Sequence, residues 1–393
     1  MSATIEFFPV GNGDMALLTL QSGRRLLMDI NIRTAADDEN NEDWPDVAAM
    51  LRSRLDRDAD GRLFVDAFLL SHPDRDHCLG LERHFHLGSP NSWKSKDDKI
   101  LIREMWSSPI VFRRKKDVDG ELCPDAQAWW TEARRRVNLY KDTANKASIQ
   151  DGDRVQVLGE DKNGKTDGIE DILVKTGTYI ERICGQLDGT FRGLLLGPRL
   201  VSKEDAETLT GKNHSSTIIR FSIKADANAD ACRFLTAGDA EVANWERVWA
   251  RNRGEPDRLS YDILLAPHHC SWHSLSHDSW SDLRERAEVS ADARHALSQA
   301  RASATIVASS NEILDDDVDP PCIRAKREYE SILSSKKGAF LCTSEECTDD
   351  VLLFTINGAG PRRGSGGTGG AFSIGGGTAT PRMADKRGGG RYA

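Results

Sequence analysis

The stretch FLLSHPDRDHCLGL, residues 68–81, places His72, Asp74, Asp76 and His77 within six positions. A run of apolar residues comes directly before them, so we expect these side chains at the carboxyl end of a buried strand. Imidazole nitrogens and carboxylate oxygens are ligands of divalent metal ions, and a tight loop after a rigid strand holds them in fixed positions. The stretch therefore predicts a metal site with ligands on both sides of one loop.

Two further apolar stretches end in residues of the same kinds. TAGDA, residues 236–240, puts Asp239 after one predicted strand, and LLAPHHCS, residues 264–271, puts His268 and His269 after another. The alternative interpretation is that these are unrelated polar strand ends in contact with solvent. Three strands that all end in potential ligands are hard to obtain by chance, so we favour one convergent site.

The composition limits the class of protein. The 393 residues are 38% hydrophobic and 29% charged, which is typical of a soluble globular chain, and no apolar run reaches the ~20 residues of a membrane span. The first residues, MSATIEFFPVGNGD, lack the basic n-region and the small-residue cleavage site of a secretory signal. Eight scattered cysteines without a CxxC pair favour reduced thiols. We therefore expect a cytoplasmic protein, with no membrane association.

Periodicity predicts alternating strands and helices around the three polar strand ends. Strands are expected at residues 4–10, 15–30 (a hairpin), 64–71, 99–112, 152–159, 215–223, 231–239, 261–269, 304–310 and 349–356. Helices are expected at residues 44–57, 124–142, 239–252 and 323–335, and CLGLERHFHL (78–87), directly after the HPDRDH motif, is expected to begin another. The segment 1–357 is predicted to be one hydrolase-like domain in which residues 88–212 form an insertion. Residues 358–393 are Gly-rich and basic, and we expect them to be disordered.

The polar motifs resemble those of one enzyme family. HPDRDH is similar to the HxHxDH signature of the metallo-β-lactamase fold, with Asp74 where the second histidine usually stands. FFPVGNGD resembles the opening turn of that family, FLTAGD its GD motif, and APHHCSWHS its PHHGSxxS element. Together they resemble the hydrolase domain of ComEC-type DNA-uptake channels and its free-standing relatives, and teichoic-acid phosphorylcholine esterases share the HxDxDH variant. The resemblance covers residues 4–88 and 213–357.

This resemblance implies an α/β (α+β) architecture, a four-layer αββα sandwich with two face-to-face sheets and helices outside. It also implies a ligand set for two divalent metal ions. His72 and Asp74 would bind one ion, Asp76, His77 and His269 the other, and Asp239 would bridge them. His269 rather than His268 is a guess at the ligand of that pair, and His214 or Asn213 would complete the first site. Asp76 and His268 would be the catalytic residues, His268 contacting the substrate phosphate or the leaving oxygen.

The ligand types also bear on the metal. Three carboxylates with two or three imidazoles form a harder site than histidines alone, so Mn²⁺ competes with Zn²⁺. Two such ions activate water and hold the attacking and leaving oxygens of a phosphodiester. Asp14 in the GNGD turn and Asp29 at a strand end are expected to buttress the ligands without binding metal. The alternative is that they serve only a tight turn and a strand end.

The substrate is suggested by the insertion, residues 88–212. It carries the basic runs RRKK (113–116) and RRR (134–136) near Trp106, Trp129 and Trp130. Cations beside aromatic rings suit single-stranded nucleic acid, although a solvated helix face and a buried core would produce the same pattern. Arg113, Arg114 and Ser271 are the predicted substrate contacts.

Three hypotheses follow. The first is a dinuclear-metal phosphodiesterase or nuclease acting on DNA or RNA. The second is a phosphodiesterase for a small or cyclic nucleotide. The third is a catalytically retired binding module in a multi-protein system, in which the C-terminal tail could hold an operon-encoded partner. Stoichiometric metal would separate the enzymes from the retired module.

Overall fold

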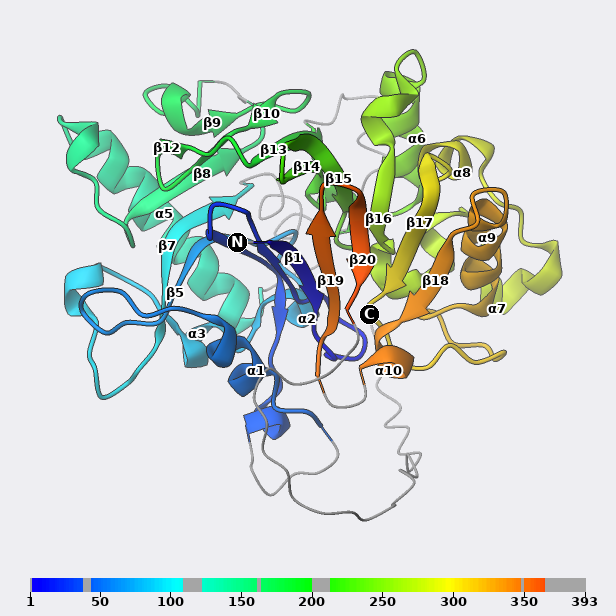
Figure 1. Ribbon diagram of the computed structural model, residues 1–393, viewed down its shortest axis with the longest axis horizontal. Coiled ribbons are helices and arrows are strands. Elements are labelled where there is room, and N and C mark those ends of the chain that lie inside the picture. Colours follow the sequence, from blue (N-terminus) through cyan, green and yellow to red (C-terminus); the bar gives the residue numbers. More distant parts are fainter. Residues whose placement is uncertain are drawn as a thin grey trace.

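The computed structural model describes residues 2–37, 44–108, 122–160, 164–199, 213–347 and 350–364. These residues form two mixed β-sheets (Figure 1). In the first sheet, β1, β2 and β3 pair antiparallel, whereas β3, β5, β7 and β8 are parallel neighbours. Its order is β20 (Gly360–Arg363), β19 (Leu352–Asn357), β1 (Ala3–Phe7), β2 (Ala16–Thr19), β3 (Arg25–Met28), β5 (Phe64–Leu69), β7 (Ile100–Ser107), β8 (Arg154–Leu158), β9 (Leu173–Val174), with β6 (Phe85–His86) beside β7.

The second sheet repeats this mixture of directions. Strands β13, β14 and β15 are antiparallel, and β15 to β18 are parallel. Its order is β10 (Tyr179–Ile180), β13 (Phe191–Gly197), β14 (Ile218–Ala225), β15 (Asn228–Thr236), β16 (Tyr261–Leu265), β17 (Ala300–Ala308), β18 (Ala339–Cys342). Short strands β4 (Ile30–Asn31), β11 (Arg182–Ile183) and β12 (Gln186–Leu187) lie outside these two orders.

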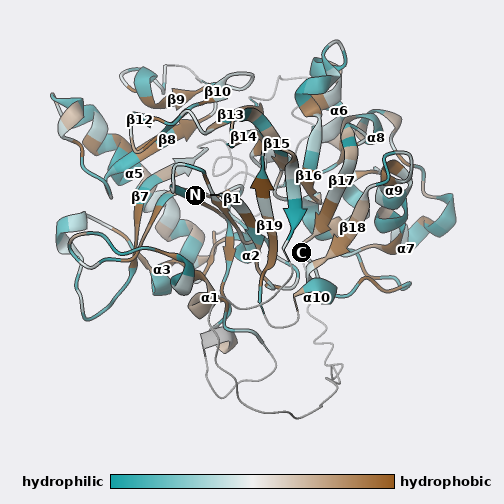
Figure 2. Cartoon of the chain, in the orientation of Figure 1, coloured by the Kyte–Doolittle hydropathy of each residue, from teal (hydrophilic) through white to brown (hydrophobic). Residues whose placement is uncertain are grey.

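Three apolar cores separate four layers. The central core joins the inner faces of both sheets, and alternation along the strands explains it: Leu26 and Met28 of β3 face the other sheet, while Leu27 faces the helices. The outer face of the first sheet packs on α1 (Val47–Arg54), α3 (Leu81–His84) and α5 (Pro124–Asp142). The outer face of the second sheet packs on α6 (Val242–Asn252), α8 (Ala291–Leu297) and α9 (Ile323–Ser334). The predicted αββα sandwich is confirmed, and the brown strands of Figure 2 follow this core.

Several predicted boundaries differ from the structure. The helix expected after the HPDRDH motif is two single turns, α2 (Arg75–Cys78) and α3, followed directly by β6. Residues 88–212, predicted to be an insertion, contribute β7, β8 and β9 to the first sheet and β10 and β13 to the second. The segment expected to be disordered from residue 358 begins with β20, which pairs antiparallel with β19. The remainder of that segment, from residue 365, lies outside the described residues.

Candidate metal centre

Four loops meet where the two sheets face each other. They follow β1, β5, β15 and β16, and they carry Asp14, residues 71–77, Asp239, and the His268–His269 pair. Because β3 and β5 are parallel in one sheet and β15 and β16 in the other, the carboxyl ends of these strands lie at a common edge of each sheet. The topology therefore brings together residues that are up to 255 positions apart in the chain, Asp14 and His269.

Backbone hydrogen bonds fix the loops to one another. The amide of Asp14 donates to the carbonyl of Asp76 (3.3 Å), and the amide of His268 donates to the carbonyl of Gly238 (3.0 Å). The amide of Thr217 donates to the carbonyl of Ser71 (2.9 Å), which joins the two sheets beside the His72 loop. These hydrogen bonds therefore restrain the backbone that carries the side chains of the site.

Close approach at this edge requires glycine. A Cβ on Gly238 would lie 2.5 Å from the hydroxyl oxygen of Ser71, and one on Gly13 would lie 2.8 Å from the carbonyl oxygen of Asp76. Both glycines also have positive φ angles, +48° and +149°. The close approach of the ligand-bearing loops therefore explains Gly13 in GNGD and Gly238 in TAGDA.

The PHHC turn is strained. His268, His269 and Cys270 have φ angles of 52°, 52° and 69°, a left-handed conformation that side chains with a Cβ seldom adopt. Such residues persist only where the surrounding structure holds them, and they are concentrated at functional sites. Here the turn directs His269 inward, where it is 1% exposed, while the His268 side chain is 15% exposed.

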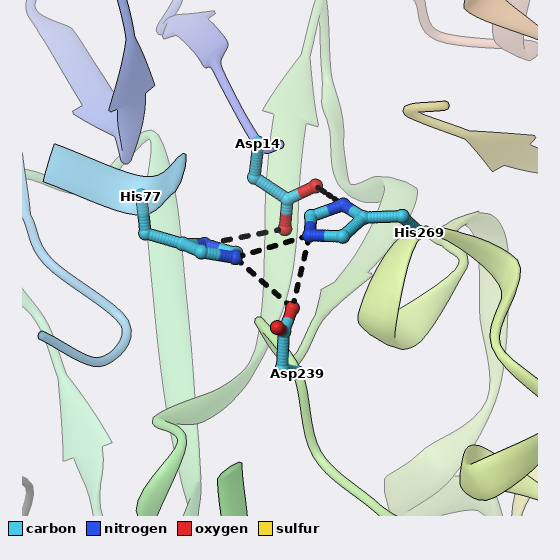
Figure 3. Close-up of side chains that lie close together, drawn as sticks. All are labelled: Asp14, His77, Asp239 and His269. Atoms are coloured by element: carbon cyan, nitrogen blue, oxygen red, sulfur yellow. Dashed lines mark hydrogen bonds and ion pairs between the residues drawn. The ribbon is translucent and has the colours of Figure 1, made fainter. Parts of the chain in front are cut away.

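One set of ligand atoms converges in the buried centre (Figure 3). The Nε2 atoms of His77 and His269 are 3.2 Å apart, and they lie 3.0 Å and 3.3 Å from Oδ1 of Asp239. Ligand atoms 2.0–2.1 Å from a four-coordinate Zn²⁺ lie roughly 3.3 Å apart. Oδ1 of Asp14 is 3.4 Å from Nδ1 of His269 and belongs to the same set of potential ligands. The spacing therefore fits a metal ion.

The protonation of His77 supports this interpretation. Its Nδ1 lies 2.8 Å from Oδ2 of Asp29, a carboxylate that also accepts from the amide of Ser71 at 2.7 Å. A carboxylate only accepts hydrogen bonds, so Nδ1 of His77 carries a proton. When the ring is neutral, Nε2 has a lone pair, and this lone pair points toward His269 and Asp239. Either a second proton or a metal cation must lie among these atoms. The carboxylate–histidine arrangement is the one that orients metal-binding imidazoles.

A second set of potential ligands lies beside the first and shares one residue with it. Nε2 of His72 is 3.5 Å from Oδ2 of Asp74 and 3.5 Å from Oδ2 of Asp239. Oδ1 of Asp239 faces His77 and His269, so its two oxygens serve different sets. We name the two sets the inner group (Asp14, His77, Asp239, His269) and the outer group (His72, Asp74, Asp239). The position of Asp239 is that of a bridging carboxylate.

Unpaired polar atoms indicate that both groups fit divalent metal. Four buried atoms of the groups make no hydrogen bond among the described residues, and a buried polar atom without a partner is costly. They are Oδ1 of Asp14, Nε2 of His72, Oδ1 of Asp239 and Nδ1 of His269. The mixture of imidazole and carboxylate donors suits Zn²⁺ or Mn²⁺. The buried cluster is therefore able to hold metal ions.

The charges of the cluster favour cations. Burial lowers the pKa of His72, but the nearby carboxylates, first Asp239, outweigh it and raise this pKa to about 9. In the same way Asp239, Asp14 and Asp76 outweigh burial and raise the pKa of His269 to about 10. Burial raises the pKa of Asp239, but the surrounding histidines hold it well below its ordinary value. A metal ion must displace protons from these rings, so it competes with acid for the site.

Asp76 and His268, the predicted catalytic residues, lie at the rim of the centre. The side chain of Asp76 is 41% exposed, with Oδ2 3.4 Å from Nε2 of His269, and it is in neither group. Nε2 of His268 lies 3.6 Å from Oδ2 of Asp239, and its ring meets that of His269 edge-on with 6.1 Å between the ring centres. Of the predicted ligands, His72, Asp74, His77, Asp239 and His269 are brought together. Their roles as ligands stay predictions.

Asp14 lies among the potential ligands. We predicted that it supports the ligands from behind, as Asp29 does through Nδ1 of His77, and its carboxylate is 2% exposed and belongs to the inner group. Its Oδ1 lies beside Nδ1 of His269, the same ring position through which Asp29 contacts His77, so the supporting role stays a prediction. The GNGD motif in the sequence indicated that Asp14 lies near the site. The distance to His269 could not be predicted, because it depends on how the two sheets face each other.

His214 and Asn213 are not brought to either group. Nε2 of His214 lies 3.2 Å from Oε2 of Glu241, and Nδ2 of Asn213 donates to Oε1 of Glu241 at 3.0 Å. Both residues thus face α6, whose Asn244 also donates to the carbonyl of His214 (2.8 Å). Neither residue belongs to the inner or the outer group, and the expected completion of the first site by one of them stays a prediction.

A His214→Ala variant should therefore keep its metal. We expect the same number of ions per chain as in the unchanged protein, measured by inductively coupled plasma mass spectrometry after desalting, because the imidazole contacts Glu241 and belongs to neither group. His72→Ala is the comparison, since its ring belongs to the outer group, and it should lose one ion. A loss of metal in His214→Ala equal to that in His72→Ala would contradict this placement.

Of the predicted substrate contacts, Ser271 lies within the described part of the chain, whereas Arg113 and Arg114 lie outside it. Ser271 is fully buried, and its hydroxyl oxygen accepts from the amide of His273 at 3.1 Å. This hydroxyl therefore begins the turn Trp272–Ser274 that follows the PHHC turn.

Among the described residues of 88–212, several of the aromatic and basic side chains lie inside the fold. Trp106 and Trp129 are completely buried, and Arg136 is buried with its Nε 2.7 Å from Oε1 of Glu132. Trp130 and Arg134 are nearer the surface, where the guanidinium stacks 4.7 Å from the ring centre. The alternative interpretation of this pattern, a buried core, therefore describes Trp106, Trp129 and Arg136.

Comparisons with known proteins add little to this geometry. No protein-family model and no curated protein matches the chain. Among solved structures, the isothiocyanate hydrolase from Delia radicum gut bacteria aligns with 87% of this chain and 96% of its own, at 10% identity and a TM-score of 0.36. In the described part of the chain, no helix has the length and apolar character needed to cross a membrane.

Proposed function

We propose that this protein is a metal-dependent hydrolase with two divalent ions, Zn²⁺ or Mn²⁺, and that it cleaves phosphodiesters. One observation carries the proposal: the inner and outer groups are adjacent, buried, and share the carboxylate of Asp239. Two ions in such a site activate water and neutralise charge on phosphate oxygens. A retired binding module has no need of this complete and costly arrangement of polar groups.

The residues of the chain have distinct tasks in this proposal. His77, His269, Asp14 and Asp239 would hold one ion, and His72, Asp74 and Asp239 the other. Asp29 keeps the proton on Nδ1 of His77 and fixes the direction of the ring. His268 is outside both groups and its side chain is 15% exposed, so it is placed to hold a phosphate oxygen or to protonate a leaving oxygen.

The substrate class rests on the motifs. HPDRDH and PHHCS resemble the phosphodiester-cleaving branch of the metallo-β-lactamase fold, and a hard ligand set suits phosphate chemistry. We propose that the substrate is DNA or RNA and that the activity is a nuclease activity like that of the ComEC-type hydrolase domain. This finer assignment is supported by the resemblance, while Trp106, Trp129 and Arg136 are removed from consideration as nucleic-acid contacts by their burial.

Hydrolysis of bis-(p-nitrophenyl) phosphate tests the reaction class. The full chain is freed of metal by chelation, then supplied with Mn²⁺ or Zn²⁺ and with labelled single- or double-stranded DNA or RNA in parallel. Cleavage that requires the added ion supports a phosphodiesterase, and the nucleic-acid reactions separate a nuclease from an enzyme for small substrates. Absence of cleavage of every substrate by a chain that holds two ions would contradict the proposal.

A further inference from the structure

A pair of thiols lies directly behind the metal-binding loop. The Sγ atoms of Cys78 and Cys123 are 3.6 Å apart, although the residues are 45 positions apart in the chain. Cys78 is the last residue of α2, next to His77, and is 1% exposed. Cys123 is the residue before the 19-residue helix α5 and is partly exposed. The pair therefore links the loop that carries Asp76 and His77 to the start of α5.

The backbone holds these two thiols together from both sides. The side chain of Asp125, in the first turn of α5, accepts from the amides of Gly80 (3.0 Å) and Glu82 (2.8 Å). Cys78 itself forms a β-bridge with Ile30, the residue after Asp29. Since α5 and α2 are each fixed to the same framework, the short distance between the sulfur atoms is a property of the fold.

The two thiols differ in chemistry. The hydrogen bond with Cys78 is the largest effect on Cys123, and together with the amide of Ala126 it lowers the pKa of Cys123 to about 7, against the effect of partial burial. Cys78 also has the carbonyl oxygen of Asp74 within 3.1 Å of its sulfur. Cys123 is thus the partly exposed nucleophile, and Cys78 is the buried thiol behind it.

We propose that Cys78 and Cys123 form a reversible disulfide under peroxide and that this bond regulates the metal-binding loop. The Cys123 thiolate attacks one oxygen of hydrogen peroxide, the O–O bond breaks, and the leaving hydroxide takes a proton to become water. Cys78 then attacks the sulfur of the resulting sulfenic acid. The S–O bond breaks, and the departing hydroxide takes the proton of Cys78 as a second water. Two thiols and one peroxide thus become one disulfide and two waters, and an external dithiol reverses the change.

Regulation follows from what Cys78 contacts, and this half of the proposal rests on the proposed metal centre. In the disulfide, Cys78 has no proton for the carbonyl oxygen of Asp74, and its sulfur must move toward α5. Asp74 directly precedes this single turn of helix, and His77 lies within it. The oxidised chain should therefore release metal severalfold faster than the reduced chain.

Peptide mapping of the full, metal-free chain tests the disulfide. After hydrogen peroxide treatment, mass spectrometry without reduction should find Cys78 and Cys123 joined, with two hydrogen atoms lost, and dithiothreitol should restore both thiols. Cys123→Ser should leave Cys78 as a thiol, and Cys78→Ala should leave a sulfenic acid on Cys123 that dimedone traps. Cys347→Ser is the matched control, because Cys347 is also partly exposed but burial raises its pKa to about 12. A disulfide between other cysteines, or sulfinic acid on Cys123 without a cross-link, would overturn the proposal.

The effect of the disulfide on metal release is measured in a separate experiment. Transfer of Zn²⁺ from the protein to EDTA is timed for reduced and oxidised chains, and the difference should vanish in Cys123→Ser. Equal rates in both states of the unchanged chain would overturn the regulatory half, while the cross-link itself is judged without metal. A chain that binds no Zn²⁺ in either state would count against the proposed metal centre and against regulation through it, and would leave the cross-link result standing.

Discussion

Replacing Asp239 by asparagine should remove bound metal and lower the rate of phosphodiester hydrolysis by at least about 10³-fold. The reason is that its two carboxylate oxygens face different groups, so one substitution weakens both ion sites. Asparagine preserves the size of the side chain but not its charge, and a neutral amide does not balance two adjacent cations. Metal content after desalting and turnover of bis-(p-nitrophenyl) phosphate measure the two effects.

The control for this variant is Asp282→Asn, which removes a carboxylate exposed on α7 (Trp280–Leu283). It should keep both the metal and the rate. Thermal melting followed by circular dichroism establishes that both variants are folded. Full metal content together with an unchanged rate in Asp239→Asn would exclude the shared-carboxylate mechanism.

Substitution of Asp14 by asparagine should weaken the inner ion by about 100-fold or more, because the structure places this carboxylate among the potential ligands. Titration with Co²⁺ measures the affinity, and the visible spectrum of the bound ion reports its ligands. Loss of a ligand should change the spectrum of the inner site, whereas the outer group, which does not include Asp14, should bind as before.

Asp29→Asn is the matched comparison for Asp14→Asn. Asp29 contacts Nδ1 of His77 from behind and belongs to neither group, so this variant should lower affinity roughly 10–100-fold while the spectrum keeps its form. An Asp14→Asn chain with an unaltered spectrum would return Asp14 to the supporting role that the sequence suggested. The two variants thus separate a ligand from a residue that positions one.

Local sequence determined most of the architecture. The helix expected at residues 124–142 is α5 (Pro124–Asp142), and the predicted strands at 64–71 and 261–269 contain β5 and β16. These succeed because apolar periodicity and helix-start residues act over a few positions. For the same reason the polar strand ends could be recognised as one site, since a strand fixes where its last residue points. Strand β13 was missed, because FRGLLLG has glycines and little alternation.

Only the tertiary structure decided which of these residues meet. The order of strands and the facing of the two sheets bring Asp14 to His269 and leave His214 on Glu241. The same packing buries Trp106 and Arg136, for which the sequence left a substrate surface and a buried core both open, and it sets Cys78 against Cys123. The physical reason is that the types of the residues record their chemistry, whereas the distances between them depend on contacts between segments far apart in the chain.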